Sequence, residues 1–263
     1  MRRLEPNLDS GPSANSRMKF KFLDGLFGMV QDKALDYVIL RNYETLPERV
    51  PGSDIDILCA INDLIKFEKA IHQQALECGW SIESSYEKNY RIRHVKLVRV
   101  TVEEFCALRF DISSDIGLGP FRLLDGRGIL DRKQRYRKIY RPSEIDESLV
   151  NVINAYYVGT PIKEKYGERV ASLSDQKQTH IRHELRKVFG TAPSTLAQLN
   201  MARGRRETRS IVLQLFVNSL RRSLSRTITD FCHWSKSSLY RIRVPSGKVV
   251  VLLGPDGIGK STL

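Results

Sequence analysis

The stretch PGSDIDILC, residues 51–59, sets the fold that we expect for the first half of the chain. Its polar and apolar residues alternate, which is typical of a β-strand with one buried face. Residues two apart in a strand point to the same side, so Asp54 and Asp56 share one face. Two carboxylates held this close repel each other unless a cation lies between them, and Mg²⁺ prefers such oxygen ligands. We therefore expect a magnesium site at these two acids.

A third acidic residue has the same setting. In LRFDIS, residues 108–113, Asp111 lies between two apolar residues, so we expect another strand that presents a carboxylate. Gly52 and Ser53, directly before the first two acids, would let a phosphate approach the backbone. A second interpretation stays open, because acids of this kind also occur at solvated strand ends without a function.

These features resemble the nucleotidyltransferase fold, whose signature is a Gly-Ser turn, a strand with two acids and a third acid on a later strand. The resemblance implies that Asp54 and Asp56 bind two metal ions. It also implies that Asp111 helps to bind metal and activates the attacking hydroxyl. One departure concerns the turn, which the family usually places at the end of the first strand, where this chain has Arg41-Asn42. We therefore expect the part that grips a triphosphate to be altered.

The residues around these acids predict an α/β domain over residues 18–142, after a polar tail (1–17) that we expect to be disordered. Apolar spacing predicts a helix from Leu64 through Phe67, Ile71 and Leu76 that ends at Gly79. The remaining elements expected here are a helix at 18–30 and strands at 36–42, 54–57, 80–86, 93–100 and 105–113.

Residues 143–240 have a helical pattern instead. Ser143 and Asp146 form a capping box that predicts a helix start, and helical sequence continues over 163–190. A further helix is expected at 210–232, because apolar residues recur there at steps of three and four. That apolar stripe consists of Leu213, Val217, Leu220, Leu224, Ile228 and Phe231.

The last residues, VVVLLGPDGIGKSTL (249–263), predict a buried strand followed by a phosphate-binding loop. Glycines allow backbone N–H groups to curl around phosphate oxygens. Lys260 would reach the β- and γ-phosphates of ATP, and the Ser261 hydroxyl would ligate Mg²⁺. The nucleotide-binding residues that we expect in this loop are Gly254, Asp256, Gly257, Gly259, Lys260, Ser261 and Thr262.

The loop resembles that of thymidylate kinases, in which the loop aspartate faces the acceptor nucleotide, a role that Asp256 would have by resemblance. We expect residues 241–263 to be the start of a P-loop α/β domain whose first helix and catalytic partners would follow Leu263. As given, the chain would hold only part of a nucleotide at this loop.

The order of these motifs, over residues 36–263, resembles a bacterial group of thymidylate-kinase-like proteins with a nucleotidyltransferase-like N-terminal part. That group is often associated with surface polysaccharide synthesis. The leading hypothesis is phosphoryl transfer from MgATP to a nucleotide or another small hydroxyl acceptor. One alternative is metal-dependent nucleotidyl transfer through Asp54, Asp56 and Asp111. Another is a non-enzymatic nucleotide-sensing or scaffold protein at the membrane surface.

The formal net charge of the 263-residue chain is +13, and it is unevenly spread. Residues 201–250 hold 11 basic residues against two acids, a local net charge of +9. A basic amphipathic helix of this kind suits an anionic membrane surface, which we expect residues 203–226 to contact if they do more than pack against the protein. No nucleic-acid-binding motif accompanies the charge.

The sequence lacks a secretory signal and zinc-type cysteine spacing, so we expect a cytoplasmic protein, either free or peripheral to the inner face of the membrane.

Overall fold

Strands β2 (Asp54–Cys59) and β5 (Phe105–Ser113) lie side by side at the centre of the fold. The computed structural model describes residues 14–50, 54–101, 105–158, 164–189, 215–221 and 223–243. β2 and β5 are parallel, and they belong to a five-stranded sheet with the order β1-β2-β5-β4-β3. The other pairs, which involve β1 (Tyr37–Ile39), β4 (Ile92–Val100) and β3 (Ser81–Asn89), are antiparallel. The mixed α/β class predicted for this part of the chain is confirmed.

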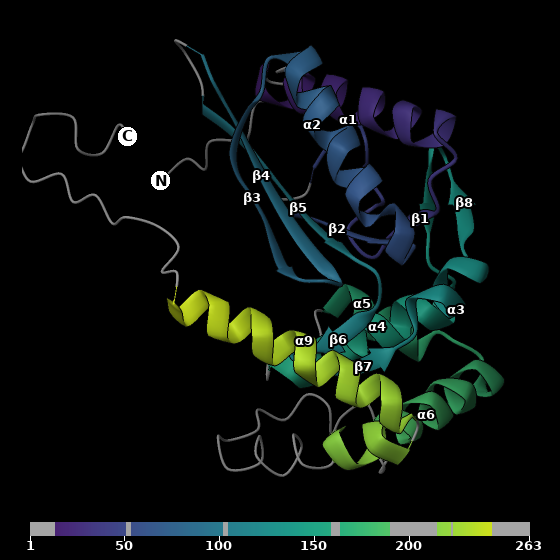
Figure 1. Ribbon diagram of the computed structural model, residues 1–263. Coiled ribbons are helices and arrows are strands. Elements are labelled where there is room, and N and C mark those ends of the chain that lie inside the picture. Colours follow the sequence, from purple (N-terminus) through teal and green to yellow (C-terminus); the bar gives the residue numbers. More distant parts are fainter. Residues whose placement is uncertain are drawn as a thin grey trace, which may run out of the picture.

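Helices α1 (Ala14–Asp32) and α2 (Leu64–Cys78) cover one face of this sheet, as Figure 1 shows. A single 3₁₀ turn (Ile61–Asp63) leads from β2 into α2. The predicted end of α2 is confirmed, because Gly79 has a left-handed backbone (φ 67°), a conformation that glycine adopts without a Cβ clash. The main buried cluster lies between these helices and the sheet and includes Phe22, Phe67, Ile55, Ile57, Phe110 and Ile112.

Two features of these helices differ from what the sequence pattern suggests. Leu76 belongs to the apolar spacing that predicts α2, but its side chain is 78% exposed, and the helix buries Ala75 and Gln74 instead. Helix α1 begins at Ala14, so it takes in the end of the tail that was expected to be disordered. The buried residues of α1 begin only at Phe22, which explains why apolar periodicity did not reveal the first turns.

The second part of the chain starts with small elements that the sequence did not reveal: β6 (Ile116–Leu118), β7 (Phe121–Leu124), α3 (Gly126–Asp131), β8 (Gln134–Tyr136) and β9 (Ile139–Arg141). Helices α4 (Glu144–Val158), α5 (Glu164–Ala171) and α6 (Asp175–Phe189) follow. Phe121 and Leu123 of β7 pack with Val152, Ile181 and Leu215 in a second buried cluster. This packing runs across residue 142, where the sequence suggested a domain boundary.

The predicted start of α4, with Ser143 as the capping residue, is confirmed. The backbone N–H of Asp146 donates to the hydroxyl of Ser143 (3.2 Å), and that hydroxyl lies 2.6 Å from a carboxylate oxygen of Asp146. These contacts satisfy a backbone donor that the first helical turn leaves unpaired.

The prediction of a single helix over residues 210–232 is wrong. Residues 215–221 are helical, Ser223 is not, and a second helix, α9, runs from Leu224 to Arg243. Residues 203–214 and 222 lie outside the described residues, as does the C-terminal part from 244. No helix in the described parts of the chain is long and apolar enough to cross a bilayer.

Candidate functional site

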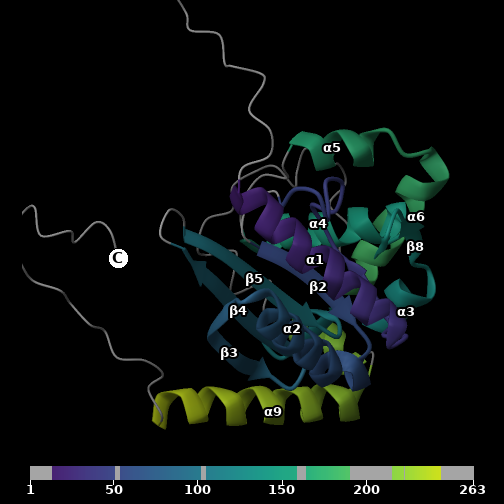
Figure 2. The same cartoon turned by 90° about the horizontal axis from the view of Figure 1, so that it is seen from above.

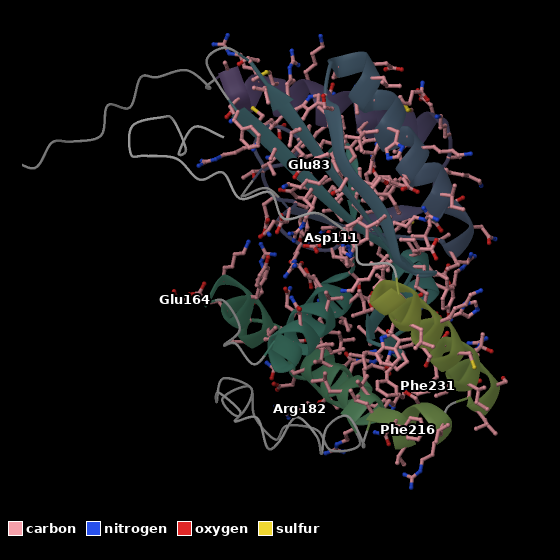
Figure 3. The ribbon with its side chains drawn as sticks, turned by 60° about the vertical axis from the view of Figure 1, so that its left-hand side comes forward. Glu83, Asp111, Glu164, Arg182, Phe216 and Phe231 are labelled. Atoms are coloured by element: carbon pink, nitrogen blue, oxygen red, sulfur yellow. The ribbon has the colours of Figure 1, made fainter. Side chains whose placement is uncertain are left out.

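Three acidic side chains gather on the face of the sheet that α1 and α2 leave open. In the β2–β5 register Asp56 lies directly opposite Asp111, and Asp54 lies opposite Arg109. The residues between them, such as Ile55 and Phe110, point to the other face and are buried. Alternation within two parallel strands therefore brings the three carboxylates together. In Figure 3 Asp111 lies between the strands above it and helices α4 to α6 below it.

Each acid of this group, which we call the Asp cluster (Asp54, Asp56 and Asp111), contacts a basic side chain. Arg41 Nε donates to Asp56 Oδ2 at 2.5 Å. Arg109 joins the other two acids, because its Nη2 donates to Asp54 Oδ2 at 2.8 Å while its Nε lies 3.3 Å from Asp111 Oδ1. Two guanidinium groups thus offset part of the negative charge of the three acids.

His94 also belongs to this site, although the sequence analysis did not select it. It lies on β4 opposite Asp111, and its Nδ1 is 2.7 Å from Asp111 Oδ1. The ring of Tyr86 on β3 packs against the imidazole, with 5.1 Å between ring centroids. Alternation in RHVKLVRV places His94 on the face opposite Val95, but only the register between strands brings it to Asp111.

Neighbouring groups change the pKa values of Asp111 and Arg41 in this site. Burial raises the pKa of Asp111, but the hydrogen bond with His94 and the electrostatic influence of His94, Arg109 and Lys88 outweigh it, so the net pKa lies below the ordinary value. The hydrogen bond to Asp56 is the main cause of a raised pKa at Arg41. Asp111 is therefore a carboxylate and Arg41 a cation at neutral pH.

The turn after β1, where the sequence has Arg41-Asn42, contains a residue in a conformation that favours glycine. Asn42 has a left-handed backbone (φ 57°), which asparagine tolerates better than most residues that carry a Cβ. Its side-chain oxygen accepts hydrogen bonds from Lys165 Nζ (2.9 Å) and Tyr166 Oη (3.0 Å) on α5. Since Arg41 contacts Asp56, this turn links the Asp cluster to the helical part of the chain.

A cavity of about 260 Å³ adjoins Asp56. One part of its wall is ionic and the other part is mainly aliphatic, an arrangement that suits a ligand with a charged and an apolar end. The ionic part consists of Arg41, Asp56 and Lys88, and the other residues are Leu40, Ile116, Gly117, Leu123, Val150, Ile153 and Asn154.

A larger cavity, of about 400 Å³, lies among the β8–β9 strands and helices α4 to α6. Tyr43 is buried in its wall, where its hydroxyl donates to Glu147 Oε2 at 2.7 Å. Burial is the main cause that raises the pKa of Tyr43 to about 12. The charged residues of the wall balance one another: Glu44, Glu144 and Glu147 against Arg141, Arg169 and Lys177. Such a wall selects a ligand by hydrogen bonds rather than by net charge.

The donor chemistry of the Asp cluster fits a hard divalent cation, because its three side chains offer carboxylate oxygens from one face of two paired strands. In the described part of the chain, however, no group of three His, Cys, Asp or Glu side chains has the arrangement of a metal site. The guanidinium of Arg109, 47% exposed at its side chain, joins Asp54 and Asp111 instead. A cation that joined these two acids would therefore take over contacts that Arg109 now makes.

The other predicted site residues lie outside the described residues. These are Gly52 and Ser53 before β2 and the whole phosphate-binding loop from Gly254 to Thr262, with Lys260 and Ser261. Their roles stay predictions.

The chain matches no protein family model and no curated protein. Among solved structures, it is similar to a candidate nucleotidyltransferase from H. pylori, with a TM-score of 0.39 and 12% identity over 86% of this chain and 98% of that one. It is also similar to JHP933 from Helicobacter pylori, with a TM-score of 0.35 and 12% identity over 89% and 100% of the two chains. Similarity this low carries no information about any reaction that this chain catalyses.

Proposed function

We propose that the chain transfers a nucleotidyl group from a nucleoside triphosphate to a hydroxyl acceptor at the Asp cluster. The observation that carries this proposal is the meeting of three carboxylates from two paired parallel strands beside a cavity with an ionic and an aliphatic part. Transfer of this kind needs acidic ligands for metal ions and a place for the nucleotide next to them.

The cavity beside Asp56 would hold the nucleotide. Its aliphatic residues would contact the base and sugar, while Arg41 and Lys88 would face the phosphates. The aliphatic wall offers few hydrogen-bond partners to a base, so we expect little preference among the four nucleoside triphosphates.

The acids would have distinct roles. Mg²⁺ held by Asp54, Asp56 and Asp111 would supply positive charge at the triphosphate. Asp111 would orient the acceptor hydroxyl by accepting its hydrogen bond, and His94 would keep the Asp111 carboxylate in place. Arg109 would exchange its carboxylate contacts for phosphate oxygens once the acids bind a cation, since guanidinium groups bind both.

Release of pyrophosphate from each nucleoside triphosphate, with Mg²⁺ and then with a chelator, tests the proposal. Asp56→Asn and Asp111→Asn should lower a Mg²⁺-dependent rate by at least about 100-fold, because each removes a charge from the metal site. Asp32→Asn is the matched control, since Asp32 is exposed at the end of α1, away from the cluster. Equal rates in all three variants would contradict the proposal, and so would a wild-type chain that neither binds nor cleaves any of the four triphosphates.

A second candidate function rests on the sequence GPDGIGKST, residues 254–262. We propose that this loop binds the phosphates of ATP through its backbone and Lys260, with Ser261 as a ligand of Mg²⁺. Phosphoryl transfer by a thymidylate-kinase-like domain would then need residues beyond 263. A nucleotide-sensing role without turnover needs only the binding step, and absence of any turnover together with ATP binding would favour it.

A further inference from the structure

Helix α9 packs against the protein with its polar side, although its sequence would lead us to expect that side in solvent. Thr227 and Asp230 are buried, whereas Leu224, Ile228 and Phe231 are 60%, 52% and 45% exposed. An amphipathic helix normally buries its apolar stripe and exposes its polar side. Three residues of the predicted apolar stripe, Leu224, Ile228 and Phe231, do recur on one side of α9, but that side lies outside the core.

The reason is a buried polar contact. The carboxylate of Asp230 accepts a hydrogen bond from Arg122 Nε (2.9 Å) and another from the hydroxyl of Tyr90. Asp115 lies 3.3 Å from the same guanidinium, and Arg91 donates to Asp115 at 3.1 Å. These groups hold α9 with Asp230 turned inward, because an unpaired buried carboxylate would be costly. The apolar side of the helix is therefore left on the outside.

The exposed apolar residues continue beyond α9. Phe216 and Val217, in the helical segment 215–221, are 36% and 37% exposed, and Leu239 near the other end of α9 is 57% exposed. In Figure 3 Phe216 and Phe231 lie on neighbouring helices on the same side of the molecule. We call these six residues the apolar surface of α9: Phe216, Val217, Leu224, Ile228, Phe231 and Leu239.

The exposed charge on these two helical segments has one sign. Arg221, Arg226 and Lys236 are exposed, while Asp230, the sole acid in the described residues 215–221 and 223–243, is buried and paired. A second copy of the chain would bring like charges together, which disfavours self-association through this surface. A partner with a negatively charged surface and an apolar interior would complement both the basic residues and the apolar side chains of α9.

We infer that α9 and residues 215–221 dock on an anionic lipid bilayer, with the apolar surface in the headgroup region and the basic residues on lipid phosphates. Basic helices with exposed Leu and Phe residues lie in the membrane interface in this way. Figures 1 and 2 show that α9 runs along the outside of the molecule past the β3 edge of the sheet, so a flat surface can meet it lengthwise. This contact uses residues 216–239, further along the chain than the segment 203–226 favoured by the sequence.

Cosedimentation of the 263-residue chain with vesicles tests the inference. We expect binding to vesicles of phosphatidylcholine with phosphatidylglycerol, weaker binding at high salt, and little binding to phosphatidylcholine alone. Arg221→Gln with Lys236→Gln should weaken binding about 25-fold, since each basic residue near an anionic bilayer contributes about fivefold. The matched control is Lys21→Gln with Lys69→Gln, two exposed lysines on α1 and α2, which should leave binding unchanged.

Apolar contacts are tested separately. Leu224→Asp with Ile228→Asp should abolish vesicle binding, whereas Ile65→Asp with Leu76→Asp, which changes two exposed apolar residues on α2, should not. All four residues are more than half exposed, so the folded state should tolerate these changes, and circular dichroism checks this. The inference is overturned if the wild-type chain binds neither vesicle type, if both α9 variants bind as well as their controls, or if the apolar pair instead disrupts a dimer seen by light scattering.

Discussion

Asp111 is the residue through which most of the candidate site is connected, because it contacts both His94 and Arg109. Its lowered pKa means that the folded state favours the ionised carboxylate. The contribution of this group to stability is therefore complete above the ordinary aspartate pKa of about 4 and is lost as the pH falls through the lower pKa of the folded state.

Asp111→Asn should consequently lower the free energy of unfolding at neutral pH by about 1 kcal/mol, a value discounted for the partial exposure of the acid. The difference from wild type should shrink as the pH falls below the ordinary aspartate pKa and through the lower pKa of the folded state, because wild-type Asp111 then becomes neutral as well. Urea unfolding across this pH range measures it. Asp131→Asn, at an exposed ion pair with Arg127, should show almost no difference at any pH, and a constant Asp111 effect would contradict the assignment.

Sequence reasoning at this scale could place the three acids on one face, because strand alternation is a local property. It could not select His94, Arg109 or Arg41 as their partners, since those contacts depend on strand register and on where the turn after β1 lies. Register is decided by packing across the sheet, which one strand's residues do not specify.

At the scale of elements, the start of α3 is held by a close backbone approach. A Cβ built on Gly126 would lie 1.9 Å from the carbonyl oxygen of Ser114, which no side-chain rotation can relieve. Gly126→Ala should therefore lower the free energy of unfolding by about 2 to 3 kcal/mol. Gly28→Ala, in α1 with open space around it, should instead raise it by roughly 0.5 to 1 kcal/mol. Thermal unfolding of both variants measures the contrast, and equal effects would contradict it.

The buried contacts of Asp230, which attach α9 to the rest of the protein, lead to a second prediction. Asp230→Asn leaves the guanidinium of Arg122 with less compensating charge in a buried network, and it should cost about 3 kcal/mol of unfolding free energy. Ser225→Asn, at an exposed position on the same helix, should have little effect. If α9 detaches before the sheet unfolds, limited proteolysis will cut residues 223–243 of the Asp230→Asn chain first. Equal unfolding free energies for the two variants would argue against the network.

The helices illustrate what periodicity can and cannot predict. The spacing of Leu224, Ile228 and Phe231 correctly indicates a helix but gives no information about which side faces the protein. That choice depends on Asp230 finding Arg122 and Tyr90, which lie more than 100 residues earlier in the chain. The break at Ser223 was missed for a similar reason, because the apolar stripe continues in phase across it.

At the scale of the whole molecule, the chain has two candidate nucleotide-binding regions, the Asp cluster in the first half and the loop at 254–262. They should act independently, because they have no residue in common and use different chemistry: carboxylates with Mg²⁺ in one, backbone N–H groups with a lysine in the other. Lys260→Ala should weaken ATP binding at the loop at least tenfold while pyrophosphate release at the Asp cluster continues.

Asp56→Asn should have the opposite effect, stopping pyrophosphate release while ATP still binds at the loop. Fluorescence titration with a labelled ATP, together with the pyrophosphate assay on the same preparations, separates the two regions. Lys248→Ala, a basic residue shortly before the loop, controls for loss of charge alone. If Lys260→Ala also stopped pyrophosphate release, the two regions would form one site, and the triphosphate bound by the loop would be the substrate of the acids.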